Sequence, residues 1–350
     1  MDDAQAGPVS SRHWAAAALG CATLLAGCSQ PESAARPVAI EIPVSGDTRV
    51  HDPGLVVGTS TRPWLVFSTG DLRVGLGAIQ LRTSPDGREW TDAGVVWTPS
   101  TEPVWAVEKI TGVENFWAPE VLVHDGTWYL YYAVSTFGSN TSAIGLRTND
   151  SFDPERPSDG WIDRGEVWSS DGTRNYNAID PTLLIDQDGQ GWMAFGSFWG
   201  GIQLLPIDFP SGKPPVGAEP ATIADRGSPP NAIEAPALLH RDGWYYLFVS
   251  FDSCCRGTAS TYNINVGRAR EVQGPYLDAD GVALSEGGGT LLLEAEGDRI
   301  GPGGQSVSGN VMAFHYYDAA LAGEPRLALR ELGWTADGWP ILQTTAPEDS

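Results

Sequence analysis

Short apolar runs rich in aromatic residues recur five times along the chain. Each run is bounded by Gly, Pro or Asp-Gly turn signals, a pattern typical of β-strands and not of long helices. The five runs occupy residues 62–68, 125–133, 188–196, 242–250 and 309–317. Their spacing of roughly 50 to 70 residues indicates a repeated supersecondary unit.

A second feature precedes each aromatic run by about the length of a strand and a turn. It is a short segment that contains Pro and usually an acidic residue, at 51–53, 118–120, 179–181, 234–236 and 301–303. Apolar residues follow most of these segments, as at 182–185 and 237–240, so each unit begins as a hairpin. Further β-like runs at 143–147 and 265–269 would extend the hairpins to four strands.

We therefore predict an all-β fold, a five-bladed β-propeller in which each unit forms one radial sheet. In that architecture the innermost strands begin at one face near the central axis, so residues at the starts of different blades converge there. A β-sandwich or jelly roll, in which the recurrence reflects only turn chemistry, is the alternative. The predicted propeller is a single domain over residues 41–350.

The N-terminal segment has the features of a bacterial export signal. Arg12 and His13 precede an apolar run at 14–26 that is too short to span a bilayer. The run ends in Leu-Ala-Gly before Cys28, which resembles a lipobox, so we predict a lipoprotein signal over residues 1–27 with Cys28 lipidated. Residues 28–40 would tether the domain to the cell surface, with no other membrane contact. An ordinary secretory signal, which would give a secreted protein, is the alternative.

Composition excludes two classes of protein. The chain has 44 acidic and 21 basic residues and a formal net charge of -23, which would repel a nucleic acid. A hydrophobic content of 41% excludes wholesale disorder. The 14 Trp and 10 Tyr are consistent with a β-rich core, a sugar-stacking cleft or both.

Three carboxylates stand at equivalent points of three units. Asp52, Asp180 and Glu234 each lie beside or near a Pro, where an acidic residue is most often a turn-former. In a propeller, however, all three would converge in one pocket. Glycoside cleavage needs one carboxylic acid to protonate the leaving oxygen and one carboxylate to attack or to activate water. A third carboxylate could raise the pKa of the acid by repulsion.

With these residues in view, the chain resembles the arabinanases of glycoside hydrolase family 43. The matching segments are 51–53, 115–120, 135–139, 142–146, 176–181, 196–202, 232–236 and 251–257, in the family's order over nearly the whole chain. The resemblance implies a five-bladed propeller that hydrolyses α-1,5-linked L-arabinan with inversion. It implies that Asp52 is the general base, Glu234 the general acid, and Asp180 the residue that tunes and orients Glu234.

The resemblance also implies a set of sugar-contacting residues. Trp117 would be a stacking platform, and Gly138 would let the backbone approach the sugar closely. The remaining positions implied as substrate-binding are Asn177, Ser197, Phe198 and Trp199. For each Trp the alternative is a place in the core, and Ser197 could be only a hydrogen-bonding residue at a strand end.

Cys254 and Cys255 are adjacent, and one peptide holds their Cα atoms ~3.8 Å apart. A strained vicinal disulfide in contact with sugar and a pair of free buried thiols are both open. We expect no required cofactor and no metal. The family's axial His would fall at Gly304, so a structural calcium ion is doubtful, and His315 is expected to be structural.

The resemblance favours an endo-acting arabinanase, and we expect the protein to be a monomer. Two alternatives remain. One is an exo-acting arabinofuranosidase or β-xylosidase on the same fold, which would differ in the loops that close one end of the groove. The other is a surface lipoprotein that binds sugar without cleaving it.

Overall fold

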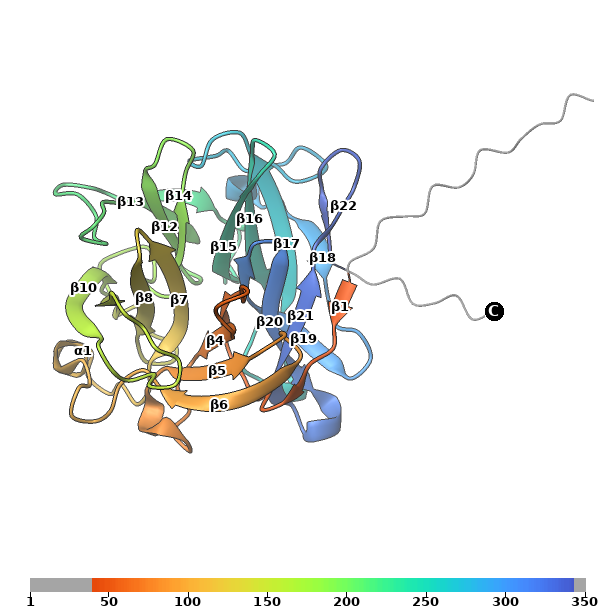
Figure 1. Cartoon of the computed structure of the whole chain (residues 1–350). Helices are drawn as coiled ribbons and strands as arrows, with labels where there is room; N and C mark the ends of the chain where they lie inside the picture. The colour runs from red at the N-terminus through yellow and green to blue at the C-terminus, as the bar shows by residue number, and fades with distance from the viewer. Residues whose placement is uncertain (1–39, 343–350) are drawn as a thin grey trace, which may run out of the picture. The chain divides into compact units, whose positions relative to one another are not determined.

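Five antiparallel sheets are arranged around a central axis in the computed structural model, which describes residues 40–342 (Figure 1). From the axis outward, four sheets run β7–β8–β9–β10, β11–β12–β13–β14, β15–β16–β17–β18 and β19–β20–β21–β1. The remaining sheet runs β3–β4–β5–β6, with β2 added to β6 in parallel at the outer edge. The predicted five-bladed propeller is therefore confirmed, and the sandwich alternative is wrong.

The strands of the first two blades are β2 (Ser45–Gly46), β3 (Gly54–Val56), β4 (Trp64–Ser68), β5 (Gln80–Ser84), β6 (Glu89–Val95), β7 (Trp117–His124), β8 (Thr127–Val134), β9 (Ser142–Asn149) and β10 (Ile162–Ser170). The third and fourth blades contain β11 (Thr182–Ile185), β12 (Gly191–Phe195), β13 (Ile202–Ile207), β14 (Ala221–Ala224), β15 (Ile233–Arg241), β16 (Trp244–Phe251), β17 (Asn263–Ala269) and β18 (Thr290–Leu293). The fifth contains β19 (Arg299–Ser308), β20 (Val311–Asp318), β21 (Glu324–Glu331) and β1 (Ile40–Ile42).

The connections carry one short helix, α1 (Val104–Lys109), and four 3-10 turns, η1 (Gly75–Gly77), η2 (Gly257–Ala259), η3 (Leu284–Glu286) and η4 (Ala319–Leu321). A small ribbon, β22 (Gly333–Trp334) with β23 (Pro340–Ile341), follows the last blade. Between residues 40 and 342, no helix has the length and apolar character needed to cross a bilayer. The predicted signal, Cys28 and nearly all of the predicted tether lie outside these residues.

The five aromatic runs form the second strand of each blade, namely β4, β8, β12, β16 and β20. Their side chains fill the wedges between neighbouring sheets because large rings match the widening gap between radial blades. Between the first two blades, for example, Trp97, Phe116 and Tyr132 pack together with ring centroids 4.9–5.7 Å apart. The repeated pattern in the sequence is therefore a packing requirement of the blades.

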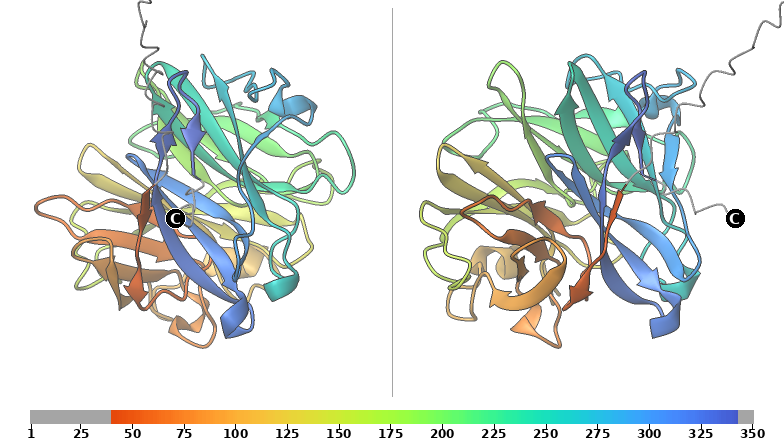
Figure 2. Two further views of the ribbon diagram at one scale, coloured as in Figure 1. Left: turned by 90° about the vertical axis from the view of Figure 1, so that its right-hand side faces the viewer. Right: turned by 45° about the vertical axis from the view of Figure 1, so that its right-hand side comes forward.

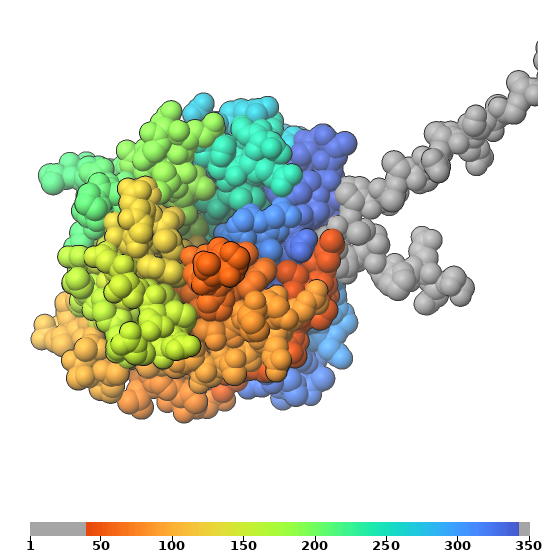
Figure 3. Space-filling view, viewed as in Figure 1, coloured from red at the N-terminus to blue at the C-terminus, as the bar shows by residue number. Residues whose placement is uncertain are grey.

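The ring is closed by the first strand. Strand β1 pairs antiparallel with β21, placing Ile40 opposite Glu331 and Ile42 opposite Leu329. Figure 2 shows this early segment running alongside the late strands of the chain, and the space-filling view of Figure 3 shows the early and late residues in contact. The last blade thus combines both ends of the described chain, so the ring cannot open without breaking this pairing.

Each inner strand begins with the same backbone irregularity. The residue before proline has a positive φ in all five blades, at Asp52 (49°), Ala118 (38°), Asp180 (56°), Ala235 (50°) and Gly301 (56°). This region is sterically unfavourable for residues other than Gly, by about 1–2 kcal/mol. The kink accompanies a break in strand pairing in β7, β15 and β19. It brings Pro residues to the axis, where four of them line a central cavity: Pro53, Pro119, Pro181 and Pro236.

We predict that Ala118→Gly leaves the protein as stable as wild type or stabilises it by up to about 1 kcal/mol, because Gly adopts the φ of 38° without strain. In the matched control, Ala133→Gly, the replaced residue lies fully buried in β8 and should cost about 1 kcal/mol or more. Urea unfolding measures both. Equal destabilisation by the two substitutions would contradict strain at Ala118.

Candidate active site

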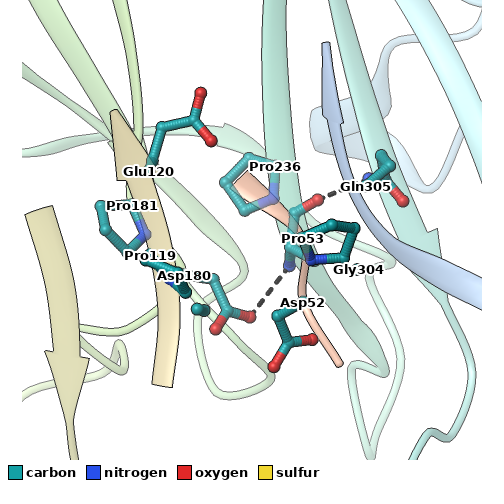
Figure 4. Close-up of a pocket in the computed structure, with 11 residues that line it drawn as sticks. Asp52, Pro53, Pro119, Glu120, Asp180, Pro181, Pro236, Gly304 and Gln305 are labelled. Carbon is teal, nitrogen blue, oxygen red and sulfur yellow. Dashed lines mark hydrogen bonds between the residues drawn. The ribbon is translucent and has the colours of Figure 1, made fainter. Parts of the chain in front are cut away.

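Three carboxylates meet near the axis, each supplied by a different blade. Asp52 precedes β3, Asp180 precedes β11, and Glu234 lies in β15. Figure 4 shows Asp52 and Asp180 beside each other at one end of the axial cavity. Glu234 interacts electrostatically with both, and the amide of the next residue, Ala235, donates to Asp180 Oδ2 at 3.1 Å. The kinked start of each inner strand therefore brings the three acids together.

Asp52 is held in its ionised form. Its Oδ2 atom accepts hydrogen bonds from His51 Nδ1 and Thr69 Oγ1, each at 2.7 Å. Burial alone would raise the pKa of Asp52, but the interactions with His51 and Thr69 outweigh it and hold that pKa well below its usual range. Asp52 is therefore a carboxylate across the physiological range, as a general base must be.

Glu234 has the opposite electrostatic character. It is 7% exposed, and its carboxyl accepts hydrogen bonds from Ser197 Oγ at 2.6 Å and from the Tyr262 hydroxyl. Burial raises its pKa and the charge of Asp52 adds to that effect, although both hydrogen bonds act in the other direction. This group can hold a proton at a higher pH than an ordinary glutamate can.

Asp180 also has a raised pKa. Burial and repulsion by Glu234 and Asp52 raise its pKa well above the usual value, against the hydrogen bond from the Ala235 amide. From the sequence we expected Asp180 to raise the pKa of Glu234. For Glu234, burial is the main cause and Asp52 is the charge that contributes. Both Asp180 and Glu234 therefore bind a proton at a higher pH than ordinary carboxyl groups do.

The cavity beneath these carboxylates measures about 30 Å³, room for about two water molecules. Glu120, from β7, also lines it, and Figure 4 shows this side chain at the end away from Asp52 and Asp180. Burial raises the pKa of Glu120 to about 8, although a hydrogen bond with Ser306 acts against this shift. The carboxyl is consequently protonated near neutral pH.

The axial residues do not fit a calcium site. Calcium prefers a cage of six to eight oxygen ligands. Here Gln305 Oε1 already accepts from Ser250 at 2.8 Å, and Gly304 has no side chain to offer as a ligand. A Cβ at Gly304 would lie 2.6 Å from Asp52 Oδ1 and 2.7 Å from His315 Nδ1. The imidazole of His315 therefore fills the space that a side chain at position 304 would need.

Several side chains predicted to contact sugar are occupied within the protein. Asn177 is 3% exposed and accepts a hydrogen bond from Ser142 Oγ at 2.6 Å. Ser197 donates to Glu234, and the Trp117 indole donates to Asn115 Oδ1 at 2.8 Å. Asn177 is thus an interior residue, and Ser197 is a partner of the acid.

Other predicted contacts face solvent. Trp199 is 37% exposed and follows the half-buried Phe198 in a left-handed turn. Gly138 is exposed with a φ of 78° and no atom near its missing side chain. Cys254 and Cys255 form a disulfide, with Cys255 exposed, so the alternative of two free thiols does not hold.

Sequence reasoning missed the residues that surround the carboxylates. His51 adjoins Asp52 and could have been considered on that ground alone. Thr69 and Tyr262 reach the site from other strands or loops and lie in no segment that drew attention. Tyr317 ends the aromatic run at 309–317, but nothing in that run pointed to a contact with His51. Their roles depend on which side chains the folded blades bring together.

A β-propeller that presents one strongly ionised carboxylate beside two carboxyls of raised pKa has the parts of a glycoside hydrolase, since that chemistry needs a base and a proton donor at one site. The family model for glycosyl hydrolases family 43 matches residues 40–340 of this chain. The chain therefore belongs to glycosyl hydrolases family 43, and the resemblance found in its motifs is confirmed.

Several proteins of known sequence or structure are similar to this chain over most of its length. The extracellular endo-alpha-(1->5)-L-arabinanase 1 of Bacillus subtilis (strain 168) is 40% identical over 330 residues, covering 94% of this chain and 96% of the relative. The extracellular exo-alpha-(1->5)-L-arabinofuranosidase of Cellvibrio japonicus (strain Ueda107) is 35% identical, covering 95% of this chain and 94% of the relative. The solved structure of a GH43 endo-arabinanase from Bacillus licheniformis superposes with a TM-score of 0.78 at 40% identity, covering 85% of this chain and 99% of that one.

We predict that Glu120 makes stability fall with rising pH. Its pKa is about 8 when folded and 4.5 in the reference state, so the folded protein binds the extra proton between these values and loses stability as pH rises through them. Glu120→Gln should therefore be more stable than wild type at pH 8, by roughly 2–4 kcal/mol, but not at pH 4.

Urea unfolding at several pH values measures this difference. Glu108→Gln, which changes an exposed acid on α1, should follow the wild-type curve. If the curves of Glu120→Gln and wild type stay parallel from pH 4 to pH 8, the buried carboxyl is not the source of the pH dependence.

Proposed function

We propose that this protein is an exported endo-arabinanase that hydrolyses α-1,5-linked L-arabinan with inversion. Family membership and the activities for which the relatives are named support the substrate and the endo mode. The observation that carries the mechanism is the division of charge in the site. Asp52 is stabilised as a carboxylate, whereas Glu234 and Asp180 have raised pKa values.

In the proposed reaction, Asp52 takes a proton from a water molecule whose oxygen attacks the anomeric carbon. Glu234 gives its proton to the glycosidic oxygen as the bond from that oxygen to the anomeric carbon breaks. The water oxygen becomes the new anomeric hydroxyl, on the face opposite the departing sugar. Asp180 accepts the 3.1 Å hydrogen bond from the Ala235 amide and so orients the peptide that follows Glu234.

The sugar subsites are proposed to lie around the exposed groups of this face. Trp199 and Phe198 would stack on sugar rings, and Gly138 would offer backbone contacts. The ring of Cys254 and Cys255 would contribute a rigid apolar edge near Asp52. Trp117, Asn177 and Ser197 would support subsite residues, because their polar atoms already have protein partners.

Two further parts of the proposal concern the whole protein. The two relatives named above are extracellular, which supports export, and the motif ending at Cys28 supports a lipid anchor. Hydrolysis by two carboxylates and water needs no cofactor, so we propose that none is used. We also propose that the enzyme acts as a monomer.

The alternative function is exo action, which the Cellvibrio japonicus relative favours. Product analysis on debranched arabinan separates the two modes. Mixed oligosaccharides early in the digest indicate endo action, and a single small product throughout indicates exo action. A sugar-binding protein without catalysis would release no product.

We predict that Asp52→Asn and Glu234→Gln each lower kcat on debranched arabinan by roughly 10²- to 10⁴-fold, because each removes one proton-transfer group. Asp242→Asn is the matched control. It changes an exposed aspartate that also has a positive φ, at 50°, and it should retain wild-type activity. Activity in either catalytic-site variant equal to that of the control would disprove the assigned role.

We also predict that kcat/KM falls on the alkaline side as Glu234 loses its proton, because Glu234 can act as the acid only while protonated. In Asp180→Asn one negative charge is gone, so the proton leaves more easily and the alkaline limb should move to lower pH by about one pH unit. A pH profile of the residual activity measures this shift. An alkaline limb at the wild-type position would contradict the tuning role of Asp180.

A further inference from the structure

A chain of hydrogen-bonding groups runs from the Cys254–Cys255 turn to Asp52. The Cys255 amide donates to the Tyr317 hydroxyl at 2.8 Å, and that hydroxyl lies 2.8 Å from His51 Nε2. His51 Nδ1 lies 2.7 Å from Asp52 Oδ2. His315 also contacts these hydrogen-bonding groups, because its ring stacks on that of His51 at a centroid distance of 3.8 Å. The arrangement involves the loop before β3, strand β20 and the turn before η2.

The proton positions of His315 follow from its partners. The Asp52 amide can only donate, and it points to His315 Nδ1 at 3.1 Å, so Nδ1 carries a lone pair. Burial lowers the pKa of His315 to about 3, with the neighbouring His51 acting in the same direction, so the ring is neutral at working pH. Its proton is therefore on Nε2, which donates to the Tyr317 hydroxyl at 3.3 Å.

The Tyr317 hydroxyl is then fully assigned. A phenolic oxygen can accept two hydrogen bonds and donate one. Its two acceptor positions are used by the Cys255 amide and by His315 Nε2. Of its three partners within 3.3 Å, only His51 Nε2 can accept its proton. Ser260 also lies against the hydroxyl, but its Oγ already accepts from the Arg256 amide at 3.0 Å. The proton of His51 consequently lies on Nδ1 and is donated to Asp52 Oδ2.

We propose that Tyr317 and His51 are positioning residues for the base, in which the Tyr317 hydroxyl fixes the Nδ1–H tautomer of His51 and this proton holds the Asp52 carboxylate in its reactive orientation. The proposal rests on the role of Asp52 proposed above. Tyr317 acts through His51 and does not touch the reacting atoms. Thr69 Oγ1 donates to the same carboxylate oxygen, so two fixed donors define the plane of the group.

The same contact opposes protonation of His51. A second proton on Nε2 would confront a hydroxyl whose acceptor positions are already used. The carboxylates of Asp52 and Glu234 favour the charged imidazole, whereas burial opposes it, and the balance leaves the pKa of His51 raised. His315 and Tyr317 are the other titratable groups against the ring, and Cys255 Sγ lies 3.8 Å from Nε2. Without the Tyr317 hydroxyl, the pKa of His51 should rise further, so that the ring stays protonated up to a higher pH. The side chain is 23% exposed, and water can then solvate Nε2–H.

The first test uses the unmodified protein. Nitrogen-15 NMR of histidine-labelled enzyme at pH 8 distinguishes the two neutral tautomers and the charged form. We expect the Nδ1–H tautomer for His51 and the Nε2–H tautomer for His315. The other three of the five histidines are assigned through His13→Gln, His124→Gln and His240→Gln, and His315→Gln separates the last two signals. An Nε2–H tautomer or a fully charged ring at His51 would overturn the proposal whatever the variants do.

The second test removes the hydroxyl. In Tyr317→Phe we expect kcat to fall roughly 10- to 100-fold with KM within about twofold, and His51 to titrate at higher pH. Tyr316→Phe, at the neighbouring position whose side chain lies on the other face of β20, should match wild type in all three measurements. Wild-type kcat in Tyr317→Phe, alongside an inactive Asp52→Asn, would refute the positioning role and leave the base intact. An active Asp52→Asn would instead refute the proposed function.

A third measurement tests the first link of the hydrogen-bond chain, from the Cys255 amide to Tyr317. Cys254→Ala/Cys255→Ala opens the ring that presents the Cys255 amide to Tyr317. The triple variant combines these two substitutions with Tyr317→Phe. If the cysteine ring and the tyrosine hydroxyl both act through His51, the fold-loss of kcat in the triple variant should be smaller than the product of the fold-losses in the cysteine variant and in Tyr317→Phe. Multiplicative losses, or a loss only in KM, would show that the ring acts on bound sugar and not through Tyr317.

Discussion

The site depends on one backbone constraint, the left-handed residue before proline at the start of every inner strand. Proline normally drives its predecessor into the extended region, so five such residues in equivalent positions are costly unless the fold enforces them. Two of the five are Asp52 and Asp180 themselves, and a third is Ala235, which follows Glu234. The same kinks that bring prolines to the axis therefore set the positions of all three carboxylates.

Bringing acids together creates a second problem, because a weakly solvated site cannot hold several like charges. The protein deals with each acid differently. Asp52 receives two hydrogen bonds and remains ionised, whereas Asp180 and Glu234 have raised pKa values. Glu120, deeper along the axis, is kept neutral by burial. This division of charge is what separates a base from an acid among similar side chains.

Much of the fold was predictable from local sequence. Each aromatic run lies in the second strand of a blade because the inter-sheet wedge selects large rings in every repeat, and the Pro segments mark the inner strands for a similar reason. The acids at blade starts could be found in the same way. Tyr262, Thr69 and Tyr317 could not, since they contact Glu234, Asp52 and His51 over 28, 17 and 266 positions, and contacts between such distant residues leave no local pattern. Glu120 was visible in a Pro segment, but its charge state is set mainly by its burial in the folded protein, which no local pattern reveals.

Gly304 and His315 show why single positions are hard to interpret without the fold. From the sequence, Gly304 suggested only that a side chain was missing at the axis, and His315 was expected to be structural. The two are coupled in space, because the pairing of β19 with β20 sets Gly303 opposite His315 and aims the imidazole at the space a Cβ on Gly304 would fill. That space gives His315 Nδ1 access to the Asp52 amide. A glycine in one strand thus allows a histidine of the next to fix the backbone of the proposed base.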